Sequence, residues 1–401
     1  MVSVLSICEN PIEIESIVPV ADKIENLSAG RIAVDVATQD ALHGLGADKK
    51  LESMGREKTR LPYPARLSTP FLGLPWWKKA QILFSTDRTF RSVVQEYNAF
   101  ICGTDSVAAR ILISAAQEVG KPTFQVFVSM NYGNTDQKTV IRKLKDVARY
   151  TLGHLTGRRF LKLPNRDGGT RCDRLFVMGR RNEDVFCDEG MPRSRIRSYG
   201  IPRFAPLFEE GQNRSKRRNR ILYITGPFAW HDWPEAHRVQ QQQVRSIADS
   251  LADQPTENGP EFVVRLHPRE SGEYYDWLEE YEQVEVESAN ADLYDSIHKS
   301  LVVATICSTV AYEASLLGRV VLLTRFPRTL EDFGPPGMRS DFLEVSSAAE
   351  LLEETDTLRD DSRYENVLGE QKENTEEVID PRTPNSDKLI AEEIINYLEN
   401  E

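Results

Sequence analysis

The sequence has few cysteines, no long apolar run and no excess of basic residues, and each shortage argues against a class of protein. The five cysteines include no Cys-x-x-Cys pair and are odd in number, which disfavours a disulfide framework or a zinc site. No segment approaches the ~20 apolar residues of a transmembrane helix, and the N-terminus lacks the basic region and long apolar core of a signal peptide. We therefore expect a cytoplasmic protein without a metal site.

The charge balance argues against a nucleic-acid partner. The chain of 401 residues carries 62 Asp and Glu against 50 Lys and Arg, a formal net charge of −12. This acidity disfavours a nucleic-acid-binding surface. The basic stretch NRSKRRNR (213–220) is interpreted as part of a solvated linker.

Short apolar runs alternate with segments of helical periodicity along most of the chain. VSVLSIC (2–8), AFICGTD (99–105) and RILYITG (220–226) are such runs, and an amphipathic segment follows each of them. This alternation is typical of parallel strands joined by crossover helices. The sequence therefore predicts an α/β protein, and its length is sufficient for two domains.

The alternation occurs in two blocks. We predict a first unit at 1–204, a linker at 205–219, a second unit at 220–384 and a C-terminal amphipathic helix at 385–401. From about residue 43 to about residue 80 the pattern is irregular and rich in proline, and no element is predicted there.

Two apolar runs of the second unit end in residues suited to binding a phosphate. One run leads into His267-Pro268 and the other into Ser308-Thr309. Because ligands of parallel α/β sheets bind at the carboxyl ends of strands, both pairs can line one cleft. Ser308 and Thr309 begin a predicted helix, whose unpaired N–H groups suit a phosphate. His267 can donate a proton or hydrogen bond to that phosphate as a nucleoside phosphate leaves.

Further candidates surround these two pairs. Glu313 lies more than one helical turn after Ser308 and is placed to reach a ribose diol. Gly226 and Pro227 follow a predicted strand directly, where glycine would let the backbone approach a ligand. Structural alternatives remain open, because a histidine before proline is often a turn residue and a Ser-Thr pair is often only an N-cap.

Four segments in order carry a resemblance to a known family: CDRLFVMGRRNEDVFCDEGMPRSRIRSYGIPRF, RILYITGP, RLHPRE and ICSTVAYEASLLGRVVLL. They resemble the nucleotide-sugar glycosyltransferases of the GT-B fold, in particular the polysialyltransferase and capsule-polysaccharide group with its HP and Ser-Ser/Thr motifs. The CDP-glycerol glycerophosphotransferases and the non-hydrolysing UDP-N-acetylglucosamine 2-epimerases are similar over the same region.

The resemblance implies two Rossmann-like domains facing across a cleft, with the nucleotide donor in the C-terminal domain, the acceptor in the N-terminal one and a last helix crossing back. His267 matches the HP histidine, which contacts the donor phosphate and assists the leaving group. Ser308 and Thr309 match the motif that binds this phosphate. Glu313 falls where related enzymes place a ribose-binding glutamate.

The sequence also departs from the relatives. Thr309-Val310 stands where the epimerases carry Gly-Gly, which argues against epimerase chemistry. The acidic-acidic-glycine motif that supplies a general base in polysialyltransferases has one literal match, at 188–190, where Gly190 suits a helix C-cap better. We assign no base, and Asp105 and Glu9 are the candidates for a base or an acceptor contact.

We therefore expect a metal-independent glycosyltransferase that moves a sugar from a nucleotide-activated donor to a surface-glycan or lipid-linked acceptor, without a further cofactor. The alternatives are glycerophosphotransfer or 2-epimerisation of a UDP-sugar on the same fold, and a non-catalytic nucleotide-binding scaffold of polysaccharide assembly. Trp76 and Trp77 lie in PFLGLPWWKKAQILF, which suits peripheral contact with the inner face of a membrane. The pattern favours the alternative, a loop that packs its tryptophans against the first unit.

Overall fold

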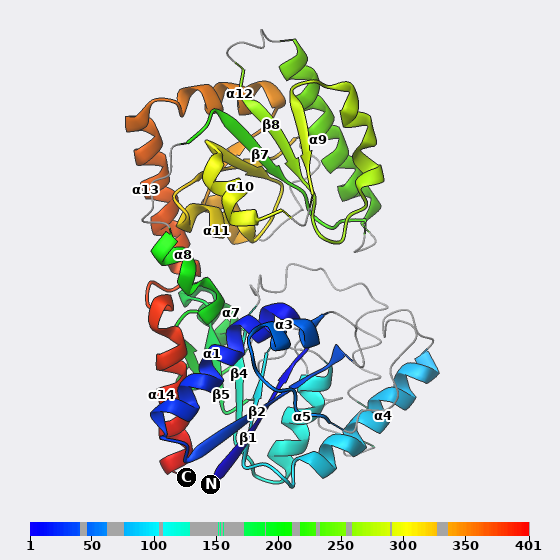
Figure 1. Ribbon diagram of the computed structural model, residues 1–401, viewed down its shortest axis with the longest axis vertical. Coiled ribbons are helices and arrows are strands. Elements are labelled where there is room, and N and C mark those ends of the chain that lie inside the picture. Colours follow the sequence, from blue (N-terminus) through cyan, green and yellow to red (C-terminus); the bar gives the residue numbers. More distant parts are fainter. Residues whose placement is uncertain are drawn as a thin grey trace. The chain divides into compact units, whose positions relative to one another are not determined.

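The computed structural model forms two compact units (Figure 1). Unit 1 comprises Met1–Ala205 and Val378–Glu401, and unit 2 comprises Pro206–Glu377. The structure describes residues 1–40, 46–61, 76–103, 107–128, 151, 153, 155, 172–188, 190–210, 217–229, 233–253, 259–288, 291–326 and 336–400.

Unit 1 is built on a parallel sheet of six strands in the order β2-β1-β3-β4-β5-β6. Its strands are mostly buried apolar runs, as expected for a sheet covered on both faces. They are β1 (Val2–Cys8), β2 (Ile32–Thr38), β3 (Ala99–Cys102), β4 (Thr123–Val126), β5 (Arg174–Val177) and β6 (Ile196–Ser198).

The described α-helices of unit 1 pack with this sheet, and α1 begins at a side-chain cap. They are α1 (Pro11–Leu27), α3 (Ala47–Ser53), α4 (Trp76–Val93), α5 (Val107–Glu118), α7 (Arg180–Asp188) and α14 (Ser386–Asn400). In α1 the side chain of Asn10 accepts a hydrogen bond from the Glu13 N–H at 3.1 Å, and Pro11 occupies the first turn. The helices α3 and α4 both have residues in the stretch for which the sequence predicts no element.

Unit 2 contains a second parallel sheet of six strands, in the order β12-β11-β10-β7-β8-β9. The strands are β7 (Arg220–Ile224), β8 (Glu261–Arg265), β9 (Val284–Glu287), β10 (Val302–Thr305), β11 (Val320–Thr324) and β12 (Leu343–Val345). The described helices are α8 (Ala205–Glu210), α9 (Pro234–Ala252), α10 (Leu293–Lys299), α11 (Val310–Leu316), α12 (Ala348–Thr357) and α13 (Asp361–Val378).

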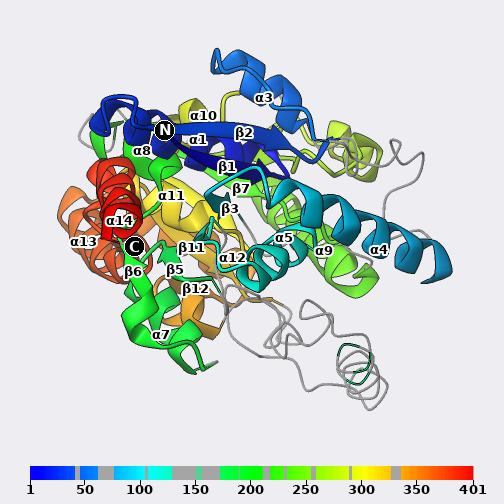
Figure 2. The same cartoon turned by 90° about the horizontal axis from the view of Figure 1, so that it is seen from below.

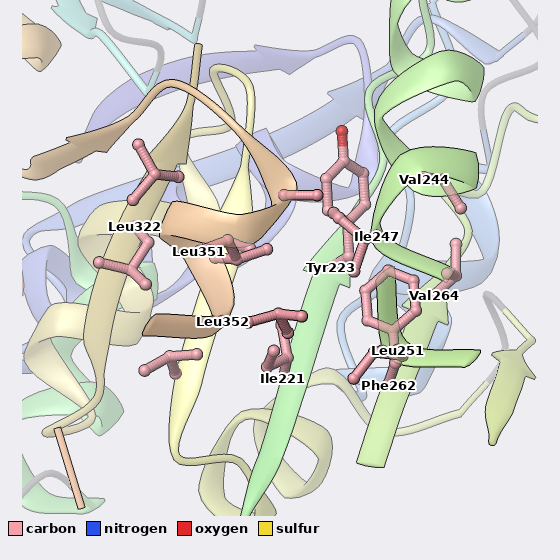
Figure 3. Packing of buried hydrophobic residues seen from close by; sticks show 14 of the residues in the cluster. Ile221, Tyr223, Val244, Ile247, Leu251, Phe262, Val264, Leu322, Leu351 and Leu352 are labelled. Atoms are coloured by element: carbon pink, nitrogen blue, oxygen red, sulfur yellow. The ribbon is translucent and has the colours of Figure 1, made fainter. Parts of the chain in front are cut away.

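The core of unit 2 lies between its sheet and the helices α9 and α12. Figure 3 shows Ile221 and Tyr223 of β7 among side chains from both helices, including Ile247 and Leu351. The hydroxyl of Tyr223 lies within 2.8 Å of Gln243 Oε1, so the one polar atom of this ring is satisfied. Apolar burial on this face holds β7 in the middle of the sheet.

The last helix returns to unit 1. α14 lies beside α1, as Figure 1 and Figure 2 show, with Lys23 Nζ 3.4 Å from a carboxylate oxygen of Asp387. Glu393 of α14 also pairs with Arg174 at 3.1 Å and Arg197 at 3.0 Å, both at the far edge of the sheet. The predicted α/β fold with a C-terminal helix crossing back is confirmed.

Two local features differ from the sequence predictions. The segment that returns to unit 1 begins at Val378, earlier than residue 385, and the stretch interpreted as a linker opens with the helix α8. In unit 2, Gly272–Glu280 forms a 3-10 helix. In the described ranges, no helix is long and apolar enough to cross a membrane.

Candidate functional site

The order in which the chain adds strands reverses at the middle of the unit 2 sheet. From β7 the chain adds β8 and then β9 on one side, and it then crosses to β10 on the other side of β7. Open α/β sheets bind ligands at such a reversal, at the carboxyl ends of the strands. The loops after β10 and β7 flank this point.

This topology brings the predicted site residues of unit 2 to one edge. Ser308 and Thr309 follow β10, Gly226 and Pro227 follow β7, and His267 follows β8. Only β7 separates β8 from β10, so their ends are two strand spacings apart, roughly 10 Å. That distance is within the span of a nucleoside diphosphate.

The half-buried His267 is held by hydrogen bonds on both its backbone and its ring. Its backbone N–H donates to Thr225 Oγ1 at 2.9 Å, and its ring Nδ1 accepts from the backbone N–H of Arg269 at 3.1 Å. Because Nδ1 acts as an acceptor, the neutral ring carries its proton on Nε2. Nε2–H is thus the donor that this side chain can offer to a phosphate.

Glu270 anchors the His267 loop, and the sequence analysis did not identify it. Its side chain is fully buried and accepts hydrogen bonds from the Thr225 hydroxyl and from Gln240 Nε2 at 2.9 Å. Tyr275 donates to the same carboxylate at 3.3 Å. The signal in the sequence was present in RLHPRE, where Glu270 follows His267 by one helical turn, but an acidic residue in a polar loop is usually solvated.

Burial shifts the titration of two groups in this network. Burial raises the pKa of the Glu270 carboxyl, and the hydrogen bond from Thr225 partly opposes that shift. Burial also lowers the pKa of His237, whose Nδ1 lies 3.7 Å from Glu270 Oε1. Both shifts favour the uncharged form, as expected for ionisable groups withdrawn from water.

The backbone N–H and carbonyl of Gly226 both bond to a side chain of the same unit. Its N–H donates to Gln240 Oε1 at 2.6 Å, and its carbonyl accepts from Gln240 Nε2 at 3.3 Å. A Cβ at this position would lie 2.9 Å from the ring of Phe228, so the glycine lets that ring fold over the loop. The N–H of Gly226 therefore serves the loop, contrary to the expectation that it approaches a ligand. Pro227 follows it, half-buried.

Ser308 and Thr309 open the helix α11 as the sequence predicts. The hydroxyl of Ser308 accepts a hydrogen bond from the Val310 N–H at 3.3 Å, whereas Thr309 is the N-cap residue and makes no side-chain cap bond. Burial raises the pKa of the neighbouring Cys307 to about 11, so this thiol is neutral at physiological pH.

Glu313 lies on α11, one turn beyond the cap. It is 5% exposed, and its Oε2 accepts a hydrogen bond from the hydroxyl of Tyr294 on α10 at 3.2 Å. A carboxylate offers about four lone-pair positions, so a side chain of this kind can accept several hydrogen bonds at once.

A similar reversal occurs in unit 1, between β1 and β3. Glu9 follows β1, and its backbone N–H donates to Glu13 Oε2 at 2.7 Å. The buried Glu13 carboxylate lies against Gly103 at the end of β3, where an added Cβ would meet it at 2.4 Å. Asp105 lies outside the described residues. The structure thus adds Glu13 to the candidate acids at this edge.

Other predicted positions lie away from these edges or outside the described residues. Glu189 is outside them, as is the side chain of Trp76. In the loop after β7, the rings of Trp233 and Phe228 stack with their centroids 6.3 Å apart. Gly190 has φ 96° after the end of α7, as its interpretation as a C-cap requires.

A cavity of about 280 Å³ lies at the opposite edge of the unit 2 sheet, near the starts of β8 and β9. It is lined by polar and apolar residues including Phe262 and Gln283. Because it lies at the amino ends of the strands, it is separate from the edge that carries His267 and Ser308. Within the described ranges, no group of three or more His, Cys, Asp or Glu side chains is placed to hold a metal ion.

Solved structures share this architecture. UDP-GlcNAc 2-epimerase from Neisseria meningitidis, bound to UDP-GlcNAc, matches with a TM-score of 0.62 at 14% identity, over 98% of this chain and 100% of that one. The Methanocaldococcus jannaschii epimerase, in complex with UDP-GlcNAc and UDP, gives 0.57 at 12% identity over 100% of both chains. The calicheamicin glycosyltransferase gives 0.55 at 13% identity, over 100% of this chain and 98% of that one. This chain has a GT-B-like fold.

The likeness is one of structure alone. No protein-family model matches the sequence, and no curated protein matches it. At these identities the solved structures establish the two-unit GT-B-like fold, while the activity has to be inferred from the edge of the sheet in unit 2.

Proposed function

We propose that this protein is an enzyme acting on a nucleotide-activated sugar, with the nucleotide bound at the strand-order reversal of unit 2. The observation that carries the proposal is the convergence of the loops after β10, β7 and β8 at this edge. Ligand sites of open α/β sheets lie at such reversals. Structures of the same fold that hold UDP or UDP-GlcNAc support a nucleotide sugar as the ligand.

Each candidate residue has a role that its geometry supports. The hydroxyls of Ser308 and Thr309 would donate to the donor phosphates, and Nε2–H of His267 would donate to the same group. Glu313 would accept a hydrogen bond from a ribose hydroxyl while keeping that of Tyr294. Thr225 and Glu270 touch no ligand in this proposal, and they position the His267 loop.

The reaction favoured by the motifs is glycosyl transfer to a surface-glycan or lipid-linked acceptor. The bond from the sugar's anomeric carbon to the diphosphate oxygen breaks, a bond from that carbon to an acceptor hydroxyl oxygen forms, and the hydroxyl proton passes to a base. Negative charge then develops on the leaving diphosphate, where a hydrogen bond from His267 stabilises it. Glu9, Glu13 and Asp105 are the acids from which we would seek the base.

A nucleotide panel tests the binding site directly. Melting temperatures would be measured with CMP, CDP, UDP, GDP and dTDP for the wild type, Ser308→Ala/Thr309→Ala and the control Ser362→Ala, an exposed position on α13. Ligand at ~100 times its dissociation constant adds about 2.7 kcal/mol, a shift of a few degrees for a domain of this size.

We expect one nucleotide to raise the melting temperature of the wild type and the control, and the double variant to lose that shift. A shift that survives in the double variant would remove Ser308 and Thr309 from the site. If neither the nucleotides nor intact nucleotide sugars shift the wild type, the proposal fails. Binding without turnover on any acceptor would favour the non-catalytic scaffold.

Epimerisation is the second candidate, because the epimerase structures match the whole chain at TM-scores of 0.62 and 0.57, above the glycosyltransferase at 0.55. When C2 is inverted by removing its hydrogen as a proton and returning a proton to the opposite face, that hydrogen exchanges with solvent. Incubation with UDP-GlcNAc in D₂O would place deuterium at C2 for an epimerase. Glycosyl transfer keeps that proton and releases UDP only when an acceptor is present. Thr309-Val310, in place of Gly-Gly, favours the second result.

A further inference from the structure

The helix α4 of unit 1 is anchored at one half and exposed at the other. Its second half is held in the core by Phe90 and Val93, which are buried among side chains of β3 and α5. Its first half carries two of the large apolar side chains that unit 1 leaves exposed, Trp77 at 52% and Phe84 at 41%. Figure 1 and Figure 2 show α4 running alongside α5.

The exposed side chains of α4 share one face. Trp77, Gln81, Phe84 and Arg88 are spaced by four, three and four residues, which places them in one stripe along a helix, and all four are exposed. Lys78 is exposed beside them, with its Nζ 5.3 Å from the centre of the Trp77 ring. We call these five residues the α4 face.

The α4 face is basic in a protein whose net charge is −12. The sequence of α4 contains one acidic residue, Asp87, which is buried and lies 3.1 Å from Arg91 Nε. Arg91 also pairs with Glu118 at 2.6 Å. The positive charge of Lys78 and Arg88 is therefore displayed together with two aromatic rings.

We propose that the α4 face docks on the anionic surface of a lipid bilayer. Tryptophan and phenylalanine insert at the level of the headgroups, while Lys and Arg on the same helix are attracted to anionic lipid. The acidic remainder of the protein is repelled by that surface, so the charge asymmetry orients the molecule. The docking is independent of the nucleotide site in unit 2.

The charges of the α4 face favour lipid over a second copy of the chain. A symmetric contact would place the same surface on both partners, and Lys78 and Arg88 would then face like charges. Trp77 and Phe84 also lie beside polar and charged side chains of the α4 face, which suits an interface that remains partly hydrated. An anionic headgroup layer satisfies both the rings and the cations.

Vesicle flotation of the full chain tests the proposal. The probes are vesicles of phosphatidylcholine alone and vesicles in which about a third of the lipid is phosphatidylglycerol. Trp77→Ala/Phe84→Ala removes the rings, and Ile12→Ala/Leu27→Ala is its control at two comparably exposed aliphatic side chains of α1. Lys78→Glu/Arg88→Glu reverses the charges, and Lys49→Glu/Arg60→Glu, also exposed in unit 1, is its control for net charge.

We expect the wild type to float with the anionic vesicles and to dissociate as salt is raised. Loss of the rings should lower the partition coefficient about tenfold, and reversal of the two charges should lower it at least about twentyfold. Both controls should bind within about threefold of the wild type. The variants should keep any nucleotide-dependent rise in melting temperature, because the two sites are separate.

Three results would overturn the proposal. The first is that the wild type does not float with anionic vesicles. The second is that the controls lose as much binding as the α4 variants. The third is that the wild type binds no vesicles but self-associates in sedimentation, and that Trp77→Ala/Phe84→Ala abolishes this self-association. That result would make the α4 face a contact between copies of the chain. None of these results depends on whether a nucleotide binds unit 2.

Discussion

The backbone N–H of His267 donates a hydrogen bond to Thr225 Oγ1 at 2.9 Å, which ties the loop after β8 to the end of β7. The same hydroxyl donates to Glu270, so one buried side chain carries both bonds. The hydrogen bond to Thr225 thus fixes the backbone of His267 against the end of β7. The position of the His267 ring relative to the loop after β10 therefore depends on the sheet, and not only on the conformation of the loop after β8.

Thr225→Val should therefore weaken both the fold and the site. The change keeps the shape of the side chain but removes the acceptor of the His267 N–H and the donor to Glu270, at a cost of about 1–3 kcal/mol. We expect a lower midpoint of urea unfolding and a smaller nucleotide-dependent rise in melting temperature. Thr225→Ser keeps the hydroxyl and should retain both. Equal behaviour of the two variants would show that these bonds do not hold the loop.

His267→Ala should separate binding from turnover. If His267 stabilises charge on the leaving phosphate, kcat with a nucleotide-sugar donor should fall by roughly a hundredfold or more, while the KM for the donor changes little. Thermal unfolding without ligand should stay close to that of the wild type, because the ring is half-buried. Turnover unchanged in this variant would contradict the role given to His267.

The half-buried His237 should make the stability of unit 2 depend on pH. Burial lowers its pKa in the folded protein, so the neutral ring stabilises the fold above the unfolded value of 6.5, and that stability is lost as pH falls through the folded value. The urea-unfolding midpoint of the wild type should fall between about pH 7.5 and about pH 5, and this fall should be smaller for His237→Gln. At about pH 7.5 the ring is neutral in both the folded and the unfolded state, so the difference between the two proteins there measures only the packing contacts that the substitution removes. Parallel curves for both proteins would rule out this contribution.

Gly200 is expected to be essential for the C-terminal return of the chain. It has φ +80°, and an added Cβ would lie 2.0 Å from Thr383 Oγ1 and 2.7 Å from the Cα of the same residue. Gly200→Ala should cost about 3–5 kcal/mol of unfolding free energy through backbone strain and this clash.

Gly120→Ala is the matched control, since Gly120 has φ +71° and open space where a Cβ would go. It carries the strain without the clash and should cost only about 1 kcal/mol. Chemical denaturation of the three proteins gives both values. Equal losses of unfolding free energy in the two variants would mean that the chain around Thr383 shifts at little cost. The close packing of Gly200 and Thr383 would then not be what holds α14 in place within unit 1.

The parts of the fold that follow from local pattern were predictable. The run Val302–Thr305 is rich in β-branched residues, and it is buried as β10. Asn10 and Pro11 mark the start of α1, because Asn is a favoured N-cap residue and Pro suits the first turn. The motif around Ser308 opens a helix because an apolar strand breaks there into hydroxyl-bearing residues. Each of these outcomes depends on residues within one or two turns of one another.

The roles of single residues at the edge were less predictable. Gly226 suggested an approach to a ligand, but its backbone groups bond to Gln240, fourteen residues later on α9. Glu270 looked like a solvated acid, but Thr225, Gln240 and Tyr275 enclose it. A hydrogen-bond partner on another element leaves no periodicity in the sequence, because any polar residue at a suitable distance in space can supply it.

By itself, the sequence determined that this protein has two blocks of parallel strands and helices, and that polar residues follow the strands at His267 and Ser308. The apolar runs alternate with segments of helical periodicity, and a strand that is apolar on both faces is buried only when helices cover both faces of its sheet. This is why the pattern predicts parallel α/β units. Only the tertiary structure decided that β7 lies between β8 and β10, that the chain reverses there, and that α14 returns to unit 1. Strand order is set by which crossover helices pack on which face, and that long-range packing is not written in any local segment.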